Sequence, residues 1–364
     1  MNSQTYKLHL GPQHPSTHGV LHIILELDGE NIVGCETDIG YLHRGIEKLA
    51  ENRKYPQVGP YLDRLDYLAG MSNNLVYVQT IEKMMNIDIP ERAQYIRVII
   101  AELMRIASHM VGIGVYGLDL GAITAVFYPF IEREKVLDIF TKLCGSRMTF
   151  NYMRTGGVIS DIDEDFIAGT NKFLDELPKM LEEFHLLLDR NEIFVARTKN
   201  VGVISKQMAE NYGLTGPNLR ASGSVYDLRK IAPYEVYDRF DFNVPVGYRG
   251  DCYDRYMVRI LEIEESMKII RQALEQLPQG EHIAKVPRVI KPEPGQCYHQ
   301  AENPKGVFGC YIVSDGTPKP YRLHFRRPSF NNISIFDEIA KGHKIADFIA
   351  IMASFDFVLG EVDA

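Results

Sequence analysis

The sequence predicts a mainly α-helical chain with small β-hairpins, an α+β fold, from three features. Long stretches repeat apolar residues at three- and four-residue steps, which is the spacing of one helix face. Two pairs of short β-rich runs each enclose a sequence typical of a tight turn. The 364 residues are 45% hydrophobic and 24% charged, an ordinary globular composition that excludes a disordered or collagen-like chain.

The chain begins with a predicted β-hairpin region, residues 1–40. Its two β-rich runs lie within residues 20–40 and are separated by Asp28–Asn31, residues that favour a short hairpin connection.

Helices are predicted through most of residues 41–300, the helical core. Periodic stretches cover about Tyr41–Met85, Glu91–Gly117, Glu132–Cys144, about Asp163–Arg190 and Asp251–Leu277. Pro90 separates the first two stretches. Residues 191–250 are rich in Gly, Pro and Tyr with weak periodicity, which predicts a long ordered loop region.

The last part of the chain, residues 301–364, is predicted to contain a second hairpin and a C-terminal helix. The strands Gly306–Val313 and Tyr321–Arg327 enclose the turn-forming segment 314–318, and a helix follows at about Gly342–Ser354. Because no repeat or linker-like segment divides the sequence, we expect a single domain over residues 1–364.

Charge and cysteine content narrow the class of protein. Forty Lys+Arg against 48 Asp+Glu, without a basic block, argue against a nucleic-acid partner. Five scattered cysteines without a C-x-x-C pair indicate a reduced, cytoplasmic-side protein, and the N-terminus lacks the pattern of a secretory signal. The apolar segment Val111–Phe130 contains glycines, Pro129 and Asp119, so we expect a buried helix end and a tight loop rather than a membrane span.

Histidines are concentrated near the N-terminus. Four of the eleven lie in the first 22 residues, and His14 and His18 share the Gly- and Pro-bounded segment 11–19. Two histidines four residues apart on a helix can share a metal ion, but Pro15 disfavours a helix there and no third ligand follows. For His9, His14 and His22 taken singly, hydrogen bonding to the backbone of a tight turn is at least as well supported as a metal site.

Three other polar positions attract attention. Arg44 precedes a helix start with paired charges, and Arg64 and Tyr67 lie where a salt-bridged helix is the simplest interpretation. Asp119 is a lone carboxylate in an apolar, Gly-rich stretch, so it must be paired or its pKa must rise. A functional role with a His or Arg partner is favoured for Asp119.

Seven motifs, in order along the chain, resemble a known family. They are GPQHPSTHGVL at 11–21, GYLHRGIEK at 40–48, DRLDYL at 63–68, LDLGA at 118–122, RASGSVYDLRK at 220–230, PVGYRGDCYDRY at 245–256 and GEVD at 360–363. They resemble the 49 kDa (D) subunit family of respiratory complex I, the NADH:quinone oxidoreductase, from about residue 8 onward. That family is related to the large subunits of NiFe hydrogenases, so the resemblance implies a hydrogenase-like helical core.

Hydrogenase activity itself is excluded by residue type. Those enzymes hold nickel and iron with two C-x-x-C pairs, and the corresponding positions here are Asp66 with Ala69 and Val358 with Glu361. Soft thiolates are what such metals require. We therefore expect an emptied metal cavity and no metal held by this chain.

The resemblance implies that His18 and Tyr67 bind a quinone headgroup and that Asp119 holds His18. This is chemically sensible, because two-electron reduction puts negative charge on two quinone oxygens, which then need donors that can release protons. A histidine of pKa about 6.5 and a tyrosine of about 10 are such donors. His14 belongs to the same quinone loop, and this loop and the stretch Gly117–Gly121 are the expected moving parts.

The resemblance also implies partners. Arg44 matches an arginine beside the terminal 4Fe–4S cluster of a neighbouring subunit, where a cation stabilises the reduced cluster. Expected partners are that iron–sulfur subunit, a 30 kDa (C)-type subunit, and the membrane subunits of the quinone channel and proton pump. The chain would be a peripheral membrane protein on the cytoplasmic side of the cell inner membrane, with menaquinone or ubiquinone as substrate.

Two departures from the family pattern are present. Many members have a histidine, thought to titrate with cluster reduction, where this chain has Thr149. We expect a lower and less pH-dependent cluster potential, which suits menaquinone. The segment Thr124–Phe127 also replaces the usual Thr-Pro-Phe-Phe, which leaves the packing around Asp119 open.

The expected function is therefore the quinone-site subunit of a proton-translocating NADH:quinone oxidoreductase. An alternative is the equivalent subunit of a complex that takes electrons from ferredoxin or a reduced deazaflavin, and these motifs do not decide the donor. A His-ligated metal hydrolase would bind zinc as a single chain. A purely structural scaffold would tolerate His18→Ala and Tyr67→Phe without loss of quinone reduction.

Overall fold

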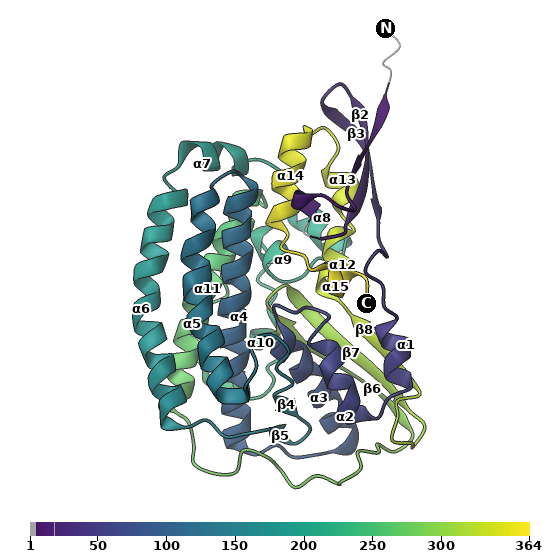
Figure 1. Ribbon diagram of the computed structural model, residues 1–364, viewed down its shortest axis with the longest axis vertical. Helices are drawn as coiled ribbons and strands as arrows, with labels where there is room; N and C mark the ends of the chain where they lie inside the picture. Colours follow the sequence, from purple (N-terminus) through teal and green to yellow (C-terminus); the bar gives the residue numbers. More distant parts are fainter. Residues whose placement is uncertain (1–4, 18) are drawn as a thin grey trace.

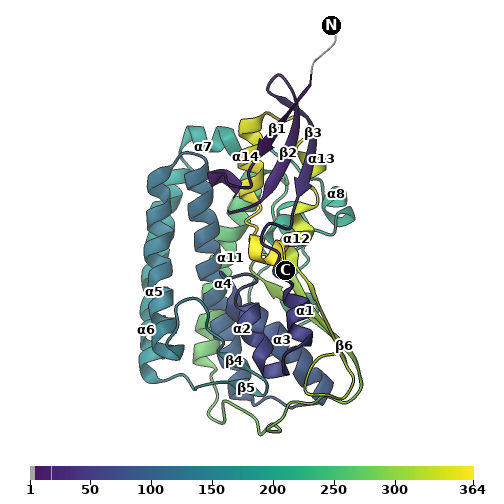
Figure 2. The ribbon, with the colours of Figure 1, turned by 45° about the vertical axis from the view of Figure 1, so that its right-hand side comes forward.

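The computed structural model describes residues 5–17 and 19–364 and is mainly helical with small antiparallel sheets, which confirms the predicted fold class. Four long helices, α4, α5, α6 and α11, stand side by side as a bundle (Figure 1). The sheet β6–β8 and helices α1–α3 lie on the other side of α4, and the N-terminal sheet β1–β3 lies beside α13 and α14 (Figures 1 and 2).

The elements occur in the following order. The strands are β1 (Tyr6–Leu10), β2 (His22–Asp28), β3 (Asn31–Asp38), β4 (Met153–Arg154), β5 (Gly157–Val158), β6 (Gly295–Asn303), β7 (Gly306–Ser314) and β8 (Arg322–Arg326). The helices are α1 (Ile46–Glu51), α2 (Tyr55–Leu62), α3 (Gly70–Met85), α4 (Glu91–Asp119), α5 (Phe127–Cys144), α6 (Glu164–Leu188), α7 (Glu192–Thr198), α8 (Lys206–Asn211), α9 (Pro217–Ala221), α10 (Leu228–Ile231), α11 (Cys252–Glu275), α12 (Pro328–Ile333), α13 (Phe336–Ile339), α14 (Ile345–Ser354) and α15 (Leu359–Val362). Short 3-10 turns lie at Pro15–Thr17, Ile123–Val126 and Tyr237–Arg239.

The predicted N-terminal hairpin is confirmed as β2 and β3, which pair with Asp28 opposite Asn31. The sequence did not predict β1, which pairs antiparallel with β2 and places Leu10 opposite Ile23. Most residues of β1 are exposed, so its sequence lacks the apolar alternation that marks a half-buried strand. The segment between β1 and β2 is therefore a loop whose two ends are fixed by the same sheet.

The predicted helical stretch from Tyr41 to Met85 is wrong in its continuity, because it is divided into α1, α2 and α3. Two side chains of the segment 63–69 hold its backbone away from a regular helix. Asp63 accepts a hydrogen bond from the backbone N–H of Asn151 (3.0 Å), and Asp66 accepts one from the N–H of Leu68 (3.0 Å). Such side-chain bonds to the backbone compete with helical hydrogen bonds.

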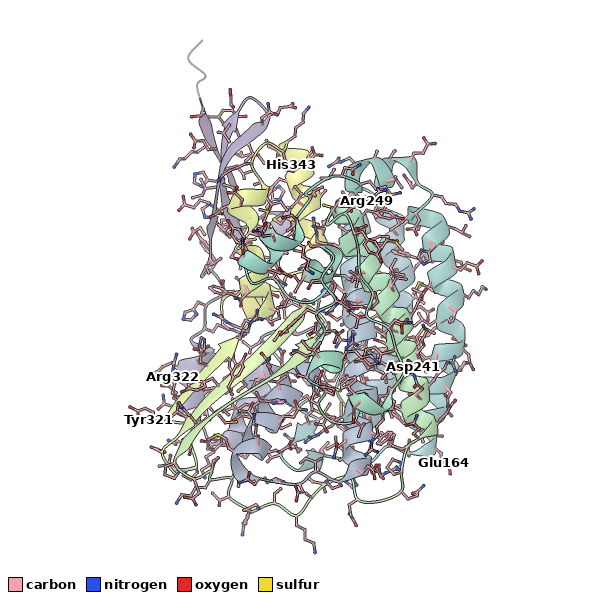
Figure 3. All side chains as sticks on the ribbon, turned by 180° about the vertical axis from the view of Figure 1, so that it is seen from behind. Glu164, Asp241, Arg249, Tyr321, Arg322 and His343 are labelled. Carbon is pink, nitrogen blue, oxygen red and sulfur yellow. The ribbon has the colours of Figure 1, made fainter. Side chains whose placement is uncertain are left out.

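The bundle helices agree well with the predicted periodic stretches. Asp163 caps α6 by accepting from the N–H of Phe166, and Asp251 caps α11 by accepting from that of Asp254 (both 2.8 Å). Helix α5 begins at Phe127, five residues before its predicted start. Glu164, at the start of α6, lies at the lower end of the bundle (Figure 3). The predicted loop region 191–250 is ordered but contains α7–α10.

The second predicted hairpin is confirmed as β7 and β8, and an additional strand, β6, pairs along the whole of β7. Helix α3 packs on this sheet. Arg322 and Tyr321 lie at the outer end of β8 (Figure 3), where Arg322 forms ion pairs with Glu47 and Glu51 of α1. Charged contacts thus join the first helix to the last sheet.

The end of the described chain is buried rather than free. Asp363 accepts hydrogen bonds from the backbone N–H groups of Gly40 (2.9 Å) and Leu42 (2.7 Å). His43 bonds the carbonyl oxygen of Asp363 through Nδ1 at 2.8 Å. These contacts attach the segment between β3 and α1 to residues more than 300 positions later.

Helix α4 lies at the centre of the molecule. Among the described residues it is long and apolar enough to cross a membrane, and 89% of its most apolar window is buried inside the protein. A buried core helix meets the same criteria, and α4 contacts α5, α11 and α14. It ends at Asp119, followed by a turn, as predicted for the stretch after Val111.

Candidate functional site

A cavity of about 650 Å³ lies at the C-terminal end of α4. Its walls come from the loop after β1, the segment between α2 and α3, α4 with the turn after it, and the region around the end of α14. The lining residues are Pro15, Ser16, Tyr67, Leu68, Val111, Gly112, Val115, Leu118, Asp119, Gly121, Ile123, Ala353, Asp356, Phe357 and Val358. The cavity is thus mainly apolar with a few polar groups, a composition that suits an organic ligand.

Tyr67 and Asp119 line this same cavity although they are far apart in the sequence. Burial, and then the neighbouring Asp66 carboxylate, raise the pKa of Tyr67 above its usual value. The phenol therefore stays protonated at neutral pH and can donate a hydrogen bond. Asp119 is half-buried and engaged in at least one interaction, in line with the expectation that a carboxylate there has a partner.

His18 lies outside the described residues, so its predicted role stays a prediction. His14 is held in a tight turn: its Nδ1 accepts from the N–H of Ser16 (3.2 Å), and its carbonyl oxygen accepts from Thr17. This matches the interpretation of a backbone-bonded histidine. His14 is not among the residues that line the cavity, whereas its neighbours Pro15 and Ser16 are.

The other N-terminal histidines bond each other. His9 Nδ1 lies 2.9 Å from His22 Nε2, and His22 Nδ1 lies 2.8 Å from Asp38. Within residues 5–17 and 19–364, no group of three or more His, Cys, Asp or Glu side chains is arranged to hold a metal ion.

Arg44 is exposed and donates to the carbonyl oxygen of Arg64 at 3.2 Å. Arg64 in turn donates to the carbonyl of Pro60, so the two guanidinium groups occupy one exposed surface. The simplest interpretation from the sequence, a salt-bridged helix at 63–67, is wrong, because this segment is a turn and Arg64 bonds to the backbone.

A set of buried charges that sequence analysis missed lies against the cavity. We call it the buried charge cluster, and it consists of Asp66, Arg259, Lys305, Asp356 and Glu361. Lys305 Nζ lies 3.4 Å from Asp66 Oδ2 and 3.5 Å from Asp356 Oδ2. Arg259 Nε lies 3.7 Å from the same oxygen of Asp356. Asp66 and Glu361 stand at two of the hydrogenase cysteine positions, but no local signal in the sequence points to Arg259, Lys305 or Asp356.

Glu361 completes the buried charge cluster from α15. Its carboxylate accepts hydrogen bonds from the N–H (3.0 Å) and hydroxyl groups of Ser329. Burial and the Asp66 carboxylate raise the pKa of Glu361 to about 7. Gly360 permits the approach, because an added Cβ would lie 2.6 Å from the carbonyl oxygen of Leu65. Helix α15 therefore packs directly on the segment that carries Tyr67.

Deeper charges account for the motif at residues 220–230. Arg220, Asp227 and Arg229 are fully buried, and they pair with Glu262, Glu302 and Glu102, whose carboxylates are also buried. Removing one partner of such a pair would leave an uncompensated charge in the interior. This motif is therefore structural, because none of its residues lines the cavity.

Comparison with known proteins identifies the family of this chain. The profile of the family described as the respiratory-chain NADH dehydrogenase 49 kDa subunit matches residues 119–294 and 285–364. The chain belongs to this family. It is 54% identical over its full length to the D subunit of the NADH-quinone oxidoreductase of Desulforamulus reducens. The corresponding D subunits of Clostridium beijerinckii and Carboxydothermus hydrogenoformans are 58% and 56% identical, and the matches span 98% and 100% of those chains.

Membership in the 49 kDa subunit family confirms the resemblance found in the sequence motifs. The chain is one subunit of a respiratory-chain NADH dehydrogenase, a membrane-bound complex, so other subunits accompany it. Its cavity and charges have to be interpreted as part of that assembly.

Proposed function

We propose that this chain forms the quinone-reducing site of an NADH:quinone oxidoreductase and that electrons reach it from a 4Fe–4S cluster in a neighbouring subunit. The observation that carries the proposal is the shared cavity of Tyr67 and Asp119 at the end of α4. The relatives are named as D subunits of NADH-quinone oxidoreductases, which favours NADH over ferredoxin or a deazaflavin as the electron source.

The residues of the cavity suit quinone reduction. Each quinone that becomes a quinol takes up two electrons and two protons. The Tyr67 phenol donates a hydrogen bond to one quinone oxygen and can give up its proton as charge develops there. His18 would serve the other oxygen, and Asp119 would orient and charge-stabilise the His18 ring. The apolar wall formed by α4 and Phe357 excludes water from the ring.

The donor set of this chain does not suit an iron–sulfur cluster of its own. Its five cysteines lie far apart in the sequence, and burial raises the pKa of Cys35 to about 12, which disfavours the thiolate ligand. We therefore assign the cluster to a neighbouring iron–sulfur subunit. The exposed surface of Arg44 and Arg64 is where that subunit would dock, because cations stabilise the extra negative charge of a reduced cluster.

The assembly follows from this assignment. We infer that the chain sits on the cytoplasmic side of the inner membrane as a peripheral subunit and contacts a 30 kDa (C)-type subunit and the membrane subunits of the quinone channel and proton pump. Purification of the tagged chain from gently solubilised membranes, with mass spectrometry of what accompanies it, tests this. Recovery of cluster and pump subunits without NADH- and flavin-binding subunits would point to another donor, and recovery of the chain alone would contradict the proposal.

The site itself is tested by Tyr67→Phe in the assembled complex. We expect severe loss of NADH-driven quinone reduction, while electron transfer from NADH to a hydrophilic artificial acceptor is retained. Tyr212→Phe is the matched control, because Tyr212 is also 38% exposed but lies outside the cavity. Unchanged quinone reduction in Tyr67→Phe would leave only the scaffold alternative.

A further inference from the structure

Asp356 is the member of the buried charge cluster that lines the cavity, and its backbone conformation there is an uncommon one. Its backbone lies in the left-handed region, with φ of 52°, which is uncommon for a residue other than glycine. Its carboxylate lies against Gly112 of α4, where an added Cβ would approach within 2.8 Å. Among the described residues, its buried Oδ2 has no hydrogen-bond donor.

An acceptor without a donor, placed by a strained backbone at a cavity wall, indicates a function. Lys305 and Arg259 attract Asp356 but lie 3.5 and 3.7 Å from its Oδ2, too far for good hydrogen bonds. Lys305 donates instead to Ser108 of α4 at 3.0 Å. The Lys305 ammonium group therefore lies between the carboxylates of Asp66 and Asp356, each of which can accept its proton.

The buried charge cluster contains more carboxylates than cations. Its three carboxylates face two cations, and the Arg327 guanidinium also acts on Glu361 from outside the cluster. The nearby cations Arg255 and Arg327 use their guanidinium groups mainly for backbone carbonyls and Ser354. Glu361 is buried close to the Asp66 carboxylate, which raises its pKa to about 7, so the cluster can hold one proton near neutral pH.

Tyr67 lies within the electric field of the buried charge cluster. Besides burial, the charges that act on its pKa are Asp66 and Asp356, which raise it, and Lys305, which lowers it. Asp119 faces the same cavity from α4. A phenolate at Tyr67 would therefore be repelled by the carboxylates and attracted by Lys305, the neighbouring group that also carries transferable protons.

We propose that the buried charge cluster stores the proton that restores Tyr67 after each quinone is reduced, and that Lys305 delivers it. This inference rests on the proposed function. In the step, the O–H bond of Tyr67 breaks and an O–H bond forms on the quinone oxygen, with both electrons supplied by the neighbouring subunit's iron–sulfur cluster. The second proton comes from His18.

The Tyr67 phenolate is then reprotonated from the buried charge cluster. An N–H bond of the Lys305 ammonium breaks and the phenol O–H of Tyr67 forms again, through water at the cavity wall beside Asp356, because Lys305 itself does not line the cavity. The Lys305 amine takes the proton of the Glu361–Asp66 pair, and solvent returns a proton to that pair. One proton enters the cluster for each proton that leaves through Tyr67. Lys305 and Glu361 act through Tyr67 and are positioning residues rather than catalytic ones.

The first test is Glu361→Gln in the assembled, membrane-bound complex, with NADH as donor and a short-chain quinone as acceptor. The amide oxygen can still accept hydrogen bonds from Ser329, but the side chain can no longer store a proton. We expect kcat to fall about tenfold and KM to stay within about twofold. We also expect the wild-type activity to change as pH rises through about 7, and this inflection to be absent from Glu361→Gln.

The matched control is Glu132→Gln, another buried carboxylate, which pairs with Lys135 on α5 outside the cluster. It should retain the wild-type kcat and pH profile. Unchanged kcat and an intact inflection in Glu361→Gln would overturn the proposal, and so would a change confined to KM, which would indicate only altered cavity shape.

The second test separates charge from proton delivery at Lys305. Lys305→Arg keeps the positive charge, but a guanidinium does not release its proton in proteins. We expect kcat in Lys305→Arg to fall as far as in Lys305→Met. Full activity in Lys305→Arg would show that charge alone is needed and would overturn the delivery role. Reduction of the artificial acceptor in the same membranes reports assembly of each variant.

Tyr67→Phe, measured in parallel, distinguishes failure of the proposed quinone site from failure of the proposed proton store. If Tyr67→Phe retains quinone reduction, the proposed function itself fails. If Tyr67→Phe loses it while Glu361→Gln and Lys305→Arg behave like wild type, the quinone site stands and the proton store is refuted. Redox-induced infrared spectra give an independent readout, because a carboxylic-acid C=O band should be lost in Glu361→Gln only.

Discussion

Arg220 and Glu262 form a fully buried ion pair, with Nη2 of Arg220 2.7 Å from Oε1 of Glu262. His109 adds a hydrogen bond of 2.9 Å to the other carboxylate oxygen of Glu262. The pair joins α9 to α11 between the cavity and the C-terminal sheet, and it therefore supports the frame on which the site is built.

Glu262→Gln should destabilise the subunit by up to about 3–5 kcal/mol, because buried Arg220 would lose one of its two closest carboxylates and keep only Glu302 at 2.7 Å. The thermal midpoint of the assembled complex and the abundance of the subunit measure this loss. Glu183→Gln, which removes an exposed carboxylate 3.9 Å from Lys179, should cost at most about 1 kcal/mol. Equal effects of the two changes would contradict a structural role for the buried network.

The same pair predicts acid sensitivity. Burial alone would raise the pKa of Glu262, but Arg220 and His109 outweigh it and hold the pKa far below its ordinary value. A group with a lowered pKa contributes stability that is present above the unfolded pKa, about 4.5, and is lost as pH falls below it. The acid side of the stability profile should therefore flatten in Glu262→Gln.

Gly112→Ala should impair quinone reduction, because the new Cβ would lie 2.8 Å from the Asp356 carboxylate and displace it. Gly114→Ala on the same helix is the control. Its Cβ would meet only Pro129 and Val126 at ordinary contact distances of 3.4–3.6 Å, and alanine favours a helix over glycine by roughly 1 kcal/mol. Steady-state kinetics of the two variants give the comparison, and similar activities would show that the position of Asp356 is unimportant.

Asp63→Asn should make stability less dependent on pH. Burial raises the pKa of Asp63 to about 7, although the N–H of Asn151 and the nearby Arg64 oppose the shift. Because the folded pKa is raised, the stabilisation is full below the unfolded value of 3.8 and is lost as pH rises through about 7. Thermal midpoints of wild type and variant between about pH 5 and 8 measure the difference in slope, and parallel curves would contradict it.

Thr149→His should introduce a titratable group on the surface near Arg147, since Thr149 is exposed and only its carbonyl is engaged, by Ser146. We expect the midpoint potential of the neighbouring cluster to rise and to become more dependent on pH. Redox titrations of the intact complex at several pH values measure this. A wild-type potential that already shifts strongly with pH would contradict the proposed effect of threonine here.

Much of the frame could be predicted from periodicity, because α6 buries one face and repeats apolar residues accordingly, while α4 is apolar and buried along most of its length. Strands β1 and β6 were not predicted, and the reason is physical. β1 exposes most of its residues, and β6 is only partly buried over its first six positions, so neither shows clear alternation. Each is held by pairing with the next strand along the chain, β1 with β2 and β6 with β7, rather than by an apolar pattern of its own.

The candidate site, too, could be predicted only in part from the sequence. Asp119 stood out because a carboxylate in an apolar stretch needs a reason, and Tyr67 was found through the family resemblance. The buried charge cluster could not be found, because Asp66, Lys305 and Asp356 look like ordinary polar residues of turns when taken one at a time. Their meaning comes from the distances of Lys305 Nζ to Asp66, 3.4 Å away but 239 residues earlier, and to Asp356, 3.5 Å away but 51 residues later.

The hydrogen bond from the N–H of Leu42 to Asp363 has a consequence for biosynthesis. Its partners are 321 residues apart, and at roughly 5–20 residues per second a ribosome needs on the order of 15–60 s to make the second after the first. Throughout that time the segment 40–43 and the surface carrying Arg44 lack their final anchor. On the proposed docking of the iron–sulfur subunit at this surface, we expect correct joining only after translation has passed Asp363.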